Sequence, residues 1–279
     1  MTKDDLGQRM KEDYEGRTQT HLMRRSHTII RLDGKAFHTY TKGFDRPYDL
    51  NLMRVMDDTA IELCRAIQGA KMAYVQSDEI SILLTDFETP QTDMWFDGNV
   101  QKITSVSASI ATAAFNNAMM HLKYEELGEE VIYLKPAYFD SRVFQVPNVD
   151  EVINNFIWRQ QDATRNSIQM GAQALYSQKQ LDKKNTSELQ ELMFQKGVNW
   201  NDYPVGFKRG RLILKEKQEQ VEIKNPRKPD APKQFVNRIA WASFDPPIFS
   251  QEKDFLRSRI PKSEFLVRGE NNEDLSRLY

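Results

Sequence analysis

Two short acidic motifs, each at the end of an apolar run, hold the side chains best suited to chemistry. Asp33 and Gly34 follow HTIIRL, and Ser77, Asp78 and Glu79 separate MAYVQ from ISILLT. These apolar runs are typical of strands. Carboxylates are the oxygen ligands that Mg²⁺ prefers, and two such ions about 3.5–4 Å apart support phosphoryl or nucleotidyl transfer. Asp33, Asp78 and the Gly34 carbonyl are therefore candidate metal ligands.

A simpler interpretation is that both aspartates are turn residues, because aspartate often occupies turns. The pattern alone favours this interpretation. Glu79 is harder to place, since neighbouring side chains of an extended run point to opposite faces and only a turn would let Asp78 and Glu79 face one site. A glycine directly after Asp33 lets the backbone approach a ligand closely, with the following amides aimed at phosphate oxygens.

The elements that must position these motifs follow in the order β-α-β-β-α-β. Apolar residues recur at helical spacing over 52–67 and 103–115, between the strand runs, and VIYLKPAYFDSRVFQVP supplies one or two further strands. We predict an α+β fold with a palm-like split βαβ (ferredoxin-like) antiparallel sheet and helices on one face. We expect residues 1–148 to form this palm-like catalytic domain.

Residues 149–279 change character. Helical patterns over 149–197 predict a helical lobe, GFKRGRLILKEKQEQVEIK predicts a strand pair, and the tail after Asp245 looks irregular. Lys208–Arg238 holds ten Lys or Arg against four Asp or Glu, which is a local basic excess in a chain of net charge −1. We expect this second part to pack on the palm as one unit.

Composition narrows the class of protein further. The chain has 279 residues, 39% of them hydrophobic, and no apolar stretch near the roughly 20 residues of a membrane helix. Its polar start has no signal-peptide core, so we expect a cytoplasmic protein without a membrane partner. The single cysteine, Cys64, excludes an internal disulfide and a cysteine-cluster zinc site, and its place on a helical stripe predicts burial. The four histidines show no zinc-like spacing.

Several segments together resemble the tRNA-His guanylyltransferase family, including its bacterial and archaeal 3′-to-5′ polymerase branch. They are IIRLDGKAFHTYTKGFDRPYD, AYVQSDEISILL, WFDGNVQKITSVSASIA, FDSRV and WRQQDATRNSI. The resemblance implies a palm domain similar to that of polymerases, two Mg²⁺ ions, and ATP, GTP and other nucleoside triphosphates as substrates. It also implies a tRNA or tRNA-like RNA partner and a homo-oligomer, usually a tetramer.

The resemblance also implies roles for single residues. Asp33 and Asp78 match the metal-binding acids, Gly34 the carbonyl ligand, and Glu79 the acid that accompanies them. Taken singly, the basic residues are typical of solvated surface side chains and His38 of a structural histidine. The positions that match nucleotide-binding or phosphate-binding residues of the family are Gly34, Lys35, Ala36, Phe37, His38, Arg46, Asp49, Ser77, Lys102, Arg142, Asn166, Lys208 and Arg209.

One segment departs from the family's eukaryotic pattern. After WRQ the eukaryotic enzymes read HINNLYN, whereas positions 164–170 here read TRNSIQM and keep only the first asparagine, Asn166. The departure favours template-dependent repair of truncated RNA 5′ ends, in which ATP or GTP activates the 5′-monophosphate and the 3′-hydroxyl of the next nucleotide attacks. The alternatives are addition of the extra 5′ guanosine to tRNA-His and a non-catalytic palm-type RNA-binding or nucleotide-binding module.

Overall fold

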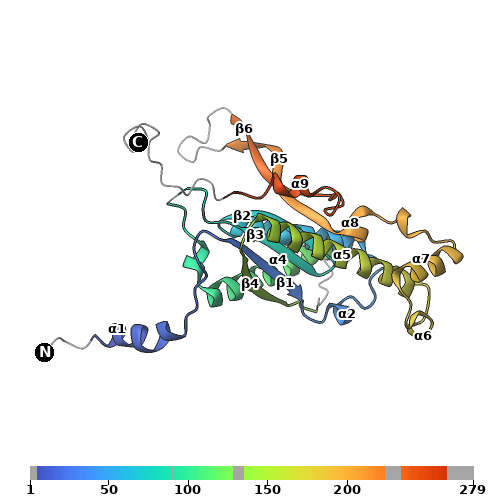
Figure 1. Ribbon diagram of the computed structural model, residues 1–279, viewed down its shortest axis with the longest axis horizontal. Coiled ribbons are helices and arrows are strands. Elements are labelled where there is room, and N and C mark those ends of the chain that lie inside the picture. The colour runs from blue at the N-terminus through green and yellow to red at the C-terminus, as the bar shows by residue number, and fades with distance from the viewer. Residues whose placement is uncertain (1–4, 90, 128–134, 224–233, 263–279) are drawn as a thin grey trace, which may run out of the picture.

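The fold is built on one six-stranded sheet in which every neighbouring pair is antiparallel, with the order β4-β1-β3-β2-β5-β6 (Figure 1). The computed structural model describes residues 5–89, 91–127, 135–223 and 234–262. This architecture confirms the α+β, palm-like fold class. The strands are β1 (His27–Gly34), β2 (Ala70–Gln76), β3 (Glu79–Leu84), β4 (Phe139–Val146), β5 (Arg211–Ile223) and β6 (Gln234–Phe244).

The predicted C-terminal strand pair extends the palm sheet. β5 pairs with β2 from Arg211 to Leu214, and β6 then pairs along β5. Residues 131–134, at the start of the predicted strand region before β4, and 224–233, between β5 and β6, lie outside the described residues. The palm and the second half of the chain therefore share one sheet.

Helices α3 (Leu50–Ala66) and α4 (Val100–Leu127) cover one face of the sheet. Both were predicted from their apolar stripes. Met56 and Leu63 of α3 and Phe115 of α4 are buried with Ile30 of β1, which points to this face. Cys64 is buried in the same layer, as predicted.

Helix α5 (Val149–Gln173) crosses the other face, on the near side of the sheet in Figure 1. Its residues Val152 and Phe156 are buried with Ile29 of β1 and Tyr74 of β2. Because we assigned this segment to a separate helical lobe, the second covering layer was not predicted. Only the C-terminal half of α5 belongs to such a lobe, where Ile168 packs with residues of the helices that follow.

The lobe and the chain beyond it are made of short elements. The segment after Asp245 was predicted to be irregular, but it contains a five-residue helix and buries Phe249 and Leu256 under α5. No sequence pattern indicated this packing, because it depends on tertiary contacts and has no periodic pattern. Residues 263–279 lie outside the described part. The short helices are α2 (Phe37–Tyr40), α6 (Gln178–Leu181), α7 (Thr186–Gln195), α8 (Val205–Arg209), α9 (Lys253–Arg257), η3 (Trp95–Gly98) and η4 (Trp200–Asp202).

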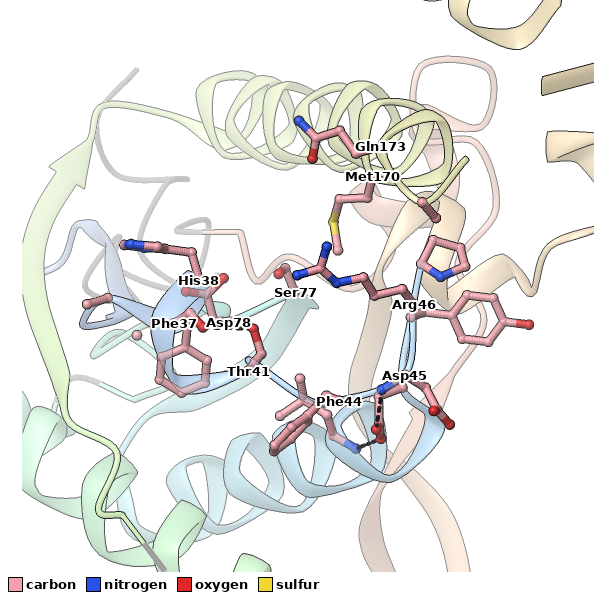
Figure 2. A pocket seen from close by; sticks show the side chains of 17 residues that line it. Phe37, His38, Thr41, Phe44, Asp45, Arg46, Ser77, Asp78, Met170 and Gln173 are labelled. Atoms are coloured by element: carbon pink, nitrogen blue, oxygen red, sulfur yellow. Dashed lines mark hydrogen bonds between the residues drawn. The ribbon is translucent and has the colours of Figure 1, made fainter. Parts of the chain in front are cut away.

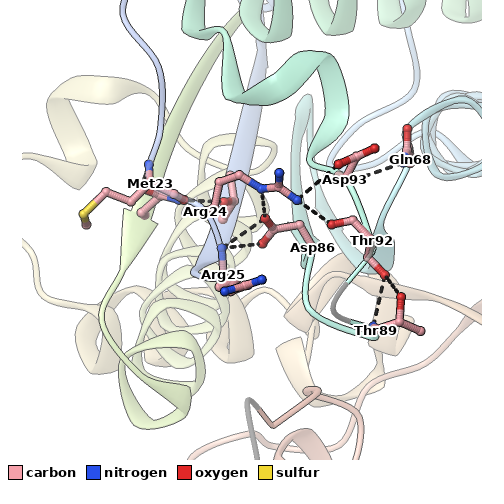
Figure 3. A network of polar contacts seen from close by, with 10 residues as sticks. Met23, Arg24, Arg25, Gln68, Asp86, Thr89, Thr92 and Asp93 are labelled. Atoms are coloured by element: carbon pink, nitrogen blue, oxygen red, sulfur yellow. Dashed lines mark hydrogen bonds and ion pairs between the residues drawn. The ribbon is translucent and has the colours of Figure 1, made fainter. Parts of the chain in front are cut away.

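The N-terminal arm carries α1 (Leu6–Met10), η1 (Lys11–Glu15) and η2 (Gly16–Thr18), buries no residue in these helices, and projects from the body in Figure 1. Figure 3 shows how its base is fixed. The buried Asp86 accepts the backbone N–H of Arg25 at 2.9 Å and pairs with the Arg24 guanidinium at 3.5 Å. Among the described residues, no helix is both long and apolar enough to cross a membrane.

Candidate active site

The strand register brings the two acidic motifs to one end of the sheet. Asp33 of β1 lies directly opposite Glu79 of β3 and Asp140 of β4, so the three side chains share the face that α5 covers. The Gly34 N–H donates to the Asp78 carbonyl at 3.1 Å, which joins the two motifs. The turn that we required for Glu79 is present, because Ser77 has a left-handed φ of 46° and reverses the chain.

A buried arginine holds Glu79. Arg159 of α5 donates to both carboxylate oxygens, from Nε to Oε1 and from Nη2 to Oε2, each at 2.7 Å. The same Nη2 donates to Asp162 at 2.9 Å. The side chains of Arg159 and Glu79 are only 7% and 13% exposed, so this bidentate pair is shielded from water. Glu79 is thus fixed and its charge compensated.

Asp33 and Asp78 have no such partner, since neither forms an ion pair with another described residue. Burial, and next to it the charge of Asp33, raises the pKa of Asp78 to about 6. Burial and the charge of Asp140 raise the pKa of Asp33, although Arg142 and Arg31 oppose the rise. Two half-buried carboxylates that repel one another form a site that a cation would stabilise.

This donor set fits Mg²⁺. Asp33 and Asp78 offer hard carboxylate oxygens, and Gly34 adds a backbone carbonyl beside them. In the described part of the chain, no group of three or more His, Cys, Asp or Glu side chains forms a complete protein cage. Mg²⁺ is usually bound by one or two carboxylates with water and substrate phosphates, so an incomplete protein shell is the arrangement expected for it.

A cavity of about 490 Å³ opens beside Asp78, between the loop that follows β1 and the end of α5 (Figure 2). In Figure 2 the Arg46 side chain reaches from this loop toward Ser77, beneath Met170 of α5. Phe37 forms part of the wall and packs on Phe115, with ring centroids 5.4 Å apart. The volume and the single cation suit a nucleotide whose phosphates approach Asp78.

Close packing shapes the wall of this cavity. A Cβ on Gly34 would lie 2.3 Å from Cδ2 of Phe37, so only glycine lets β1 pass the ring. Ala36 has a φ of 55° and starts the short helix α2. Asp49 caps α3 by accepting the Leu52 N–H at 2.9 Å, which fixes the far end of the loop.

A second cavity, of about 330 Å³, lies on the other side of Asp78. It is lined by Asp33, Glu79 and Arg159 and by Asn166 of α5, and it shares Ser77 and Asp78 with the first cavity. The candidate metal ligands therefore line two adjoining cavities. Such a division suits a reaction that joins two phosphate-bearing molecules.

The structure brings most of the expected site residues to these cavities and leaves others outside. Lys35 is exposed, and Lys102 is exposed in the first turn of α4. Arg142 pairs with Asp140 at 3.0 Å on β4. Lys208 is buried against Trp200, where its Nζ donates to the Asn201 carbonyl, and Arg209 lies over the same ring. The expected residues that line the two cavities are Asp33, Gly34, Ala36, Phe37, His38, Arg46, Asp49, Ser77, Asp78, Glu79 and Asn166.

Sequence reasoning missed several residues of the site. Arg159 and Asp162 lie three positions apart in WRQQD, a spacing at which opposite charges meet on a helix, so an ion pair was predictable although its contact with Glu79 was not. Gln173 lines both cavities and gave no signal, because amide side chains are common on any helix, whereas Met170, which also lines both, ends the TRNSIQM segment noted above.

Comparison with known proteins decides the family. The model of the family described as tRNAHis guanylyltransferase matches residues 7–147. The chain belongs to the tRNAHis guanylyltransferase family. Its enzymes are nucleotidyltransferases, and this chain is one of them, which confirms the resemblance inferred from the motifs.

Solved structures and curated relatives agree. A bacterial tRNAHis guanylyltransferase-like protein in complex with ATP is 40% identical, with a TM-score of 0.77 over 92% of this chain and 100% of that one. A bacterial protein of the same description in complex with GTP is 39% identical, with a TM-score of 0.71 over 92% and 99%. The tRNAHis guanylyltransferase of Saccharomyces cerevisiae is 27% identical over 73% of this chain and 89% of its own length.

Proposed function

We propose that this tRNAHis guanylyltransferase-family enzyme adds nucleotides in the 3′-to-5′ direction to the 5′ ends of truncated tRNA or similar RNA, guided by a template base. The observation that carries the proposal is the position of the TRNSIQM segment. It lies on α5, and its residues Asn166, Gln169 and Met170 line the cavity that holds Asp33 and Asp78. The segment that departs from the eukaryotic pattern is thus part of the candidate active site.

Two further observations support this choice over fixed guanosine addition. The chain is 40% identical to the bacterial guanylyltransferase-like protein but 27% identical to the yeast guanylyltransferase. An enzyme that follows a template needs little base recognition of its own, because pairing selects the nucleotide and the protein holds RNA by its backbone and shape. A chain of net charge −1 with a local excess of basic residues over Lys208–Arg238 is compatible with that task.

The reaction divides into two phosphoryl-transfer steps. An oxygen of the RNA 5′-monophosphate attacks the α-phosphorus of ATP or GTP and pyrophosphate leaves. The 3′-hydroxyl oxygen of the incoming nucleotide then attacks the activated 5′-phosphorus, loses its proton, and the nucleoside monophosphate leaves. Bacterial relatives bound to ATP and to GTP support the nucleotide assignment. Both steps depend mainly on positioning and on neutralising phosphate charge.

The residues of the site suit these steps. Asp33, Asp78 and the Gly34 carbonyl would hold two Mg²⁺ ions, which neutralise phosphate charge and polarise the attacking oxygen when bound. Arg46 reaches into the larger cavity and can pair with phosphate oxygens there. Arg159 fixes Glu79 and compensates its charge, so that this side chain keeps its position opposite Asp33. Because α5 lines both cavities, we propose that residues 1–148 and 149–279 act as one unit.

The experiment is incorporation of labelled nucleotide into a 5′-monophosphorylated tRNA that lacks its first nucleotide, with Mg²⁺ and ATP present. We expect the added base to complement the base opposite the gap, and Asp78→Asn to lose at least a thousand-fold in rate. Guanosine added whatever the opposite base contradicts template dependence and supports the alternative of tRNA-His guanylylation. No incorporation by the wild type, or equal incorporation by Asp78→Asn, contradicts the catalytic site and supports a binding module.

A further inference from the structure

Two arginines, Arg31 and Arg142, lie side by side on the α5 face of the sheet, next to its acidic end. We call this pair the basic row. Arg31 of β1 and Arg142 of β4 are directly opposite one another, two residues before Asp33 and two after Asp140. With about 3.3 Å per strand residue, the row lies roughly 7 Å from the carboxylates along the strands. Neither arginine lines the two cavities, so the row is outside the candidate nucleotide spaces.

This basic row is only partly neutralised. Like charges directly opposite one another on a sheet are unfavourable. Arg142 pairs with Asp140 at 3.0 Å, but its side chain remains 49% exposed. The Arg31 side chain forms no hydrogen bond or ion pair with any residue in the described part of the chain. The guanidinium carbon of Arg31 lies 5.6 Å from the ring centroid of Trp158 of α5. The row therefore has positive charge left for an outside anion.

Trp158 is unusual among the tryptophans of the described chain because 46% of it is exposed, whereas Trp95, Trp200 and Trp241 are buried. Arg159 also lies over its ring, at 4.4 Å from the centroid. The Glu79–Arg159 pair thus holds the indole beside the active site. An exposed ring beside a cation whose side chain has no ion pair among the described residues, here Arg31, is an arrangement on which bases of single-stranded nucleic acid stack.

We propose that Trp158, Arg31 and Arg142 form a docking platform for the RNA strand whose 5′ end is extended. A base near that end stacks on the exposed part of the Trp158 ring, while Arg31 and Arg142 take the adjoining phosphates. This inference rests on the proposed function, which supplies the RNA. A mononucleotide can be held within the cavities, whereas an RNA strand whose 5′ end lies at Asp33 must continue past them. The platform offers a cationic and aromatic surface for that strand, on the α5 face of the sheet next to Asp33.

The test measures RNA binding apart from chemistry. A 5′-monophosphorylated truncated tRNA with a 3′ fluorophore is titrated with the full-length protein without nucleoside triphosphate. Because stacking contributes about 1–3 kcal/mol per base, Trp158→Leu should raise the Kd at least five-fold, while Trp158→Phe stays within about three-fold of wild type. RNA should also quench tryptophan fluorescence in the wild type, and Trp158→Leu should lose most of that quenching, a signal that a purely structural role would not give.

A second variant tests the phosphate contacts. Arg31→Gln should reduce the slope of log Kd against log salt by about 0.7, the value for one phosphate of a single strand. Phe194→Leu on α7 removes another exposed aromatic ring, 65% exposed, and should leave the Kd within two-fold. Thermal unfolding of each variant checks that it folds. If Trp158→Leu does not fold, Trp158→Phe fluorescence and Arg31→Gln still decide the outcome.

Three outcomes overturn the platform. The first is a Kd for RNA within two-fold of wild type for Trp158→Leu. The second is an equal loss of RNA affinity in Phe194→Leu. The third is a change in Trp158→Leu that is confined to the Kd for ATP, which would assign the surface to the mononucleotide. If wild type extends RNA and Trp158→Leu does so with unchanged affinity, only the platform fails. If wild type neither binds nor extends the RNA, the proposed function itself fails.

Discussion

Asp78→Asn should stabilise the metal-free protein although it disables the site. The carboxylate of Asp78 is partly buried beside Asp33, and burial together with the Asp33 charge raises its pKa from the ordinary 3.8 to about 6. The folded state therefore holds the charged form of Asp78 less well than the unfolded chain does. Asparagine keeps the shape of the side chain and removes the charge.

The stability that Asp78→Asn should gain can be calculated from the rise in the pKa of Asp78. The difference between 6 and 3.8 is about 2 pH units, and each unit corresponds to about 1.4 kcal/mol, so about 3 kcal/mol is the upper bound. Partial exposure of Asp78 screens the charge and reduces the expected gain to roughly 1–3 kcal/mol. In a chain of this size that gain raises Tm by roughly 2–6 °C.

The effect of Asp78 on the free energy of unfolding depends on pH. Between about pH 4 and pH 6 the folded state binds more protons at Asp78 than the unfolded state, so this carboxyl's contribution to stability falls as pH rises through that window. The whole cost is present above about pH 7. The advantage of Asp78→Asn should therefore be largest at pH 8 and nearly absent at pH 4.

Urea unfolding with EDTA at both pH values measures the advantage. Asp86→Asn is the matched control, because Asp86 is buried but accepts the Arg25 N–H and pairs with Arg24, so its loss should lower stability. Mg²⁺ with ATP should then stabilise wild type and leave Asp78→Asn nearly unchanged. If Asp78→Asn is no more stable than wild type at pH 8 without metal, the two carboxylates do not repel one another as inferred.

Three further substitutions test other parts of the site. Arg159→Ala leaves Glu79 buried without its partner and should lower the free energy of unfolding in urea by about 3–5 kcal/mol. Combining Arg159→Ala with Glu79→Gln should recover part of that loss, and no recovery would contradict the pairing. Gly34→Ala places a Cβ against Phe37 and should lower the free energy of unfolding by about 1–3 kcal/mol. It should also weaken ATP binding, measured by calorimetry. Unchanged ATP affinity would mean that the Phe37 ring does not shape the nucleotide site. The buried Oε1 of Gln76 has no hydrogen-bond partner among the residues that the structure describes, so Gln76→Leu should leave stability unchanged or raise it. A loss above about 1 kcal/mol would reveal a partner.

Local sequence patterns were sufficient for the acidic end of the sheet. The polar residues between two apolar runs predicted the turn that joins β2 and β3. The facing of Glu79 required the conformation of Ser77, whose φ of 46° is not encoded by the serine itself. The turn was predictable, whereas its detailed geometry was not.

Long-range packing explains what the sequence did not reveal. The pairing of β2 with β5 and the crossing of α5 over the sheet join segments more than 70 residues apart, and an amphipathic stripe does not say which surface it will cover. Lys208 illustrates the same limit. It lies in a basic segment and resembles a phosphate-binding residue, but the structure buries it against Trp200, where burial lowers its pKa.

The most direct measurement of templated addition is competition among all four nucleoside triphosphates on two truncated tRNAs that differ only in the base opposite the gap. Single-turnover reactions with wild type and Mg²⁺ give the identity of the first nucleotide added to each RNA. Templated 3′-to-5′ addition predicts that the preferred nucleotide changes with the opposite base and that Asp33→Asn and Asp78→Asn abolish both products. Guanosine added to both RNAs at equal rates would contradict it.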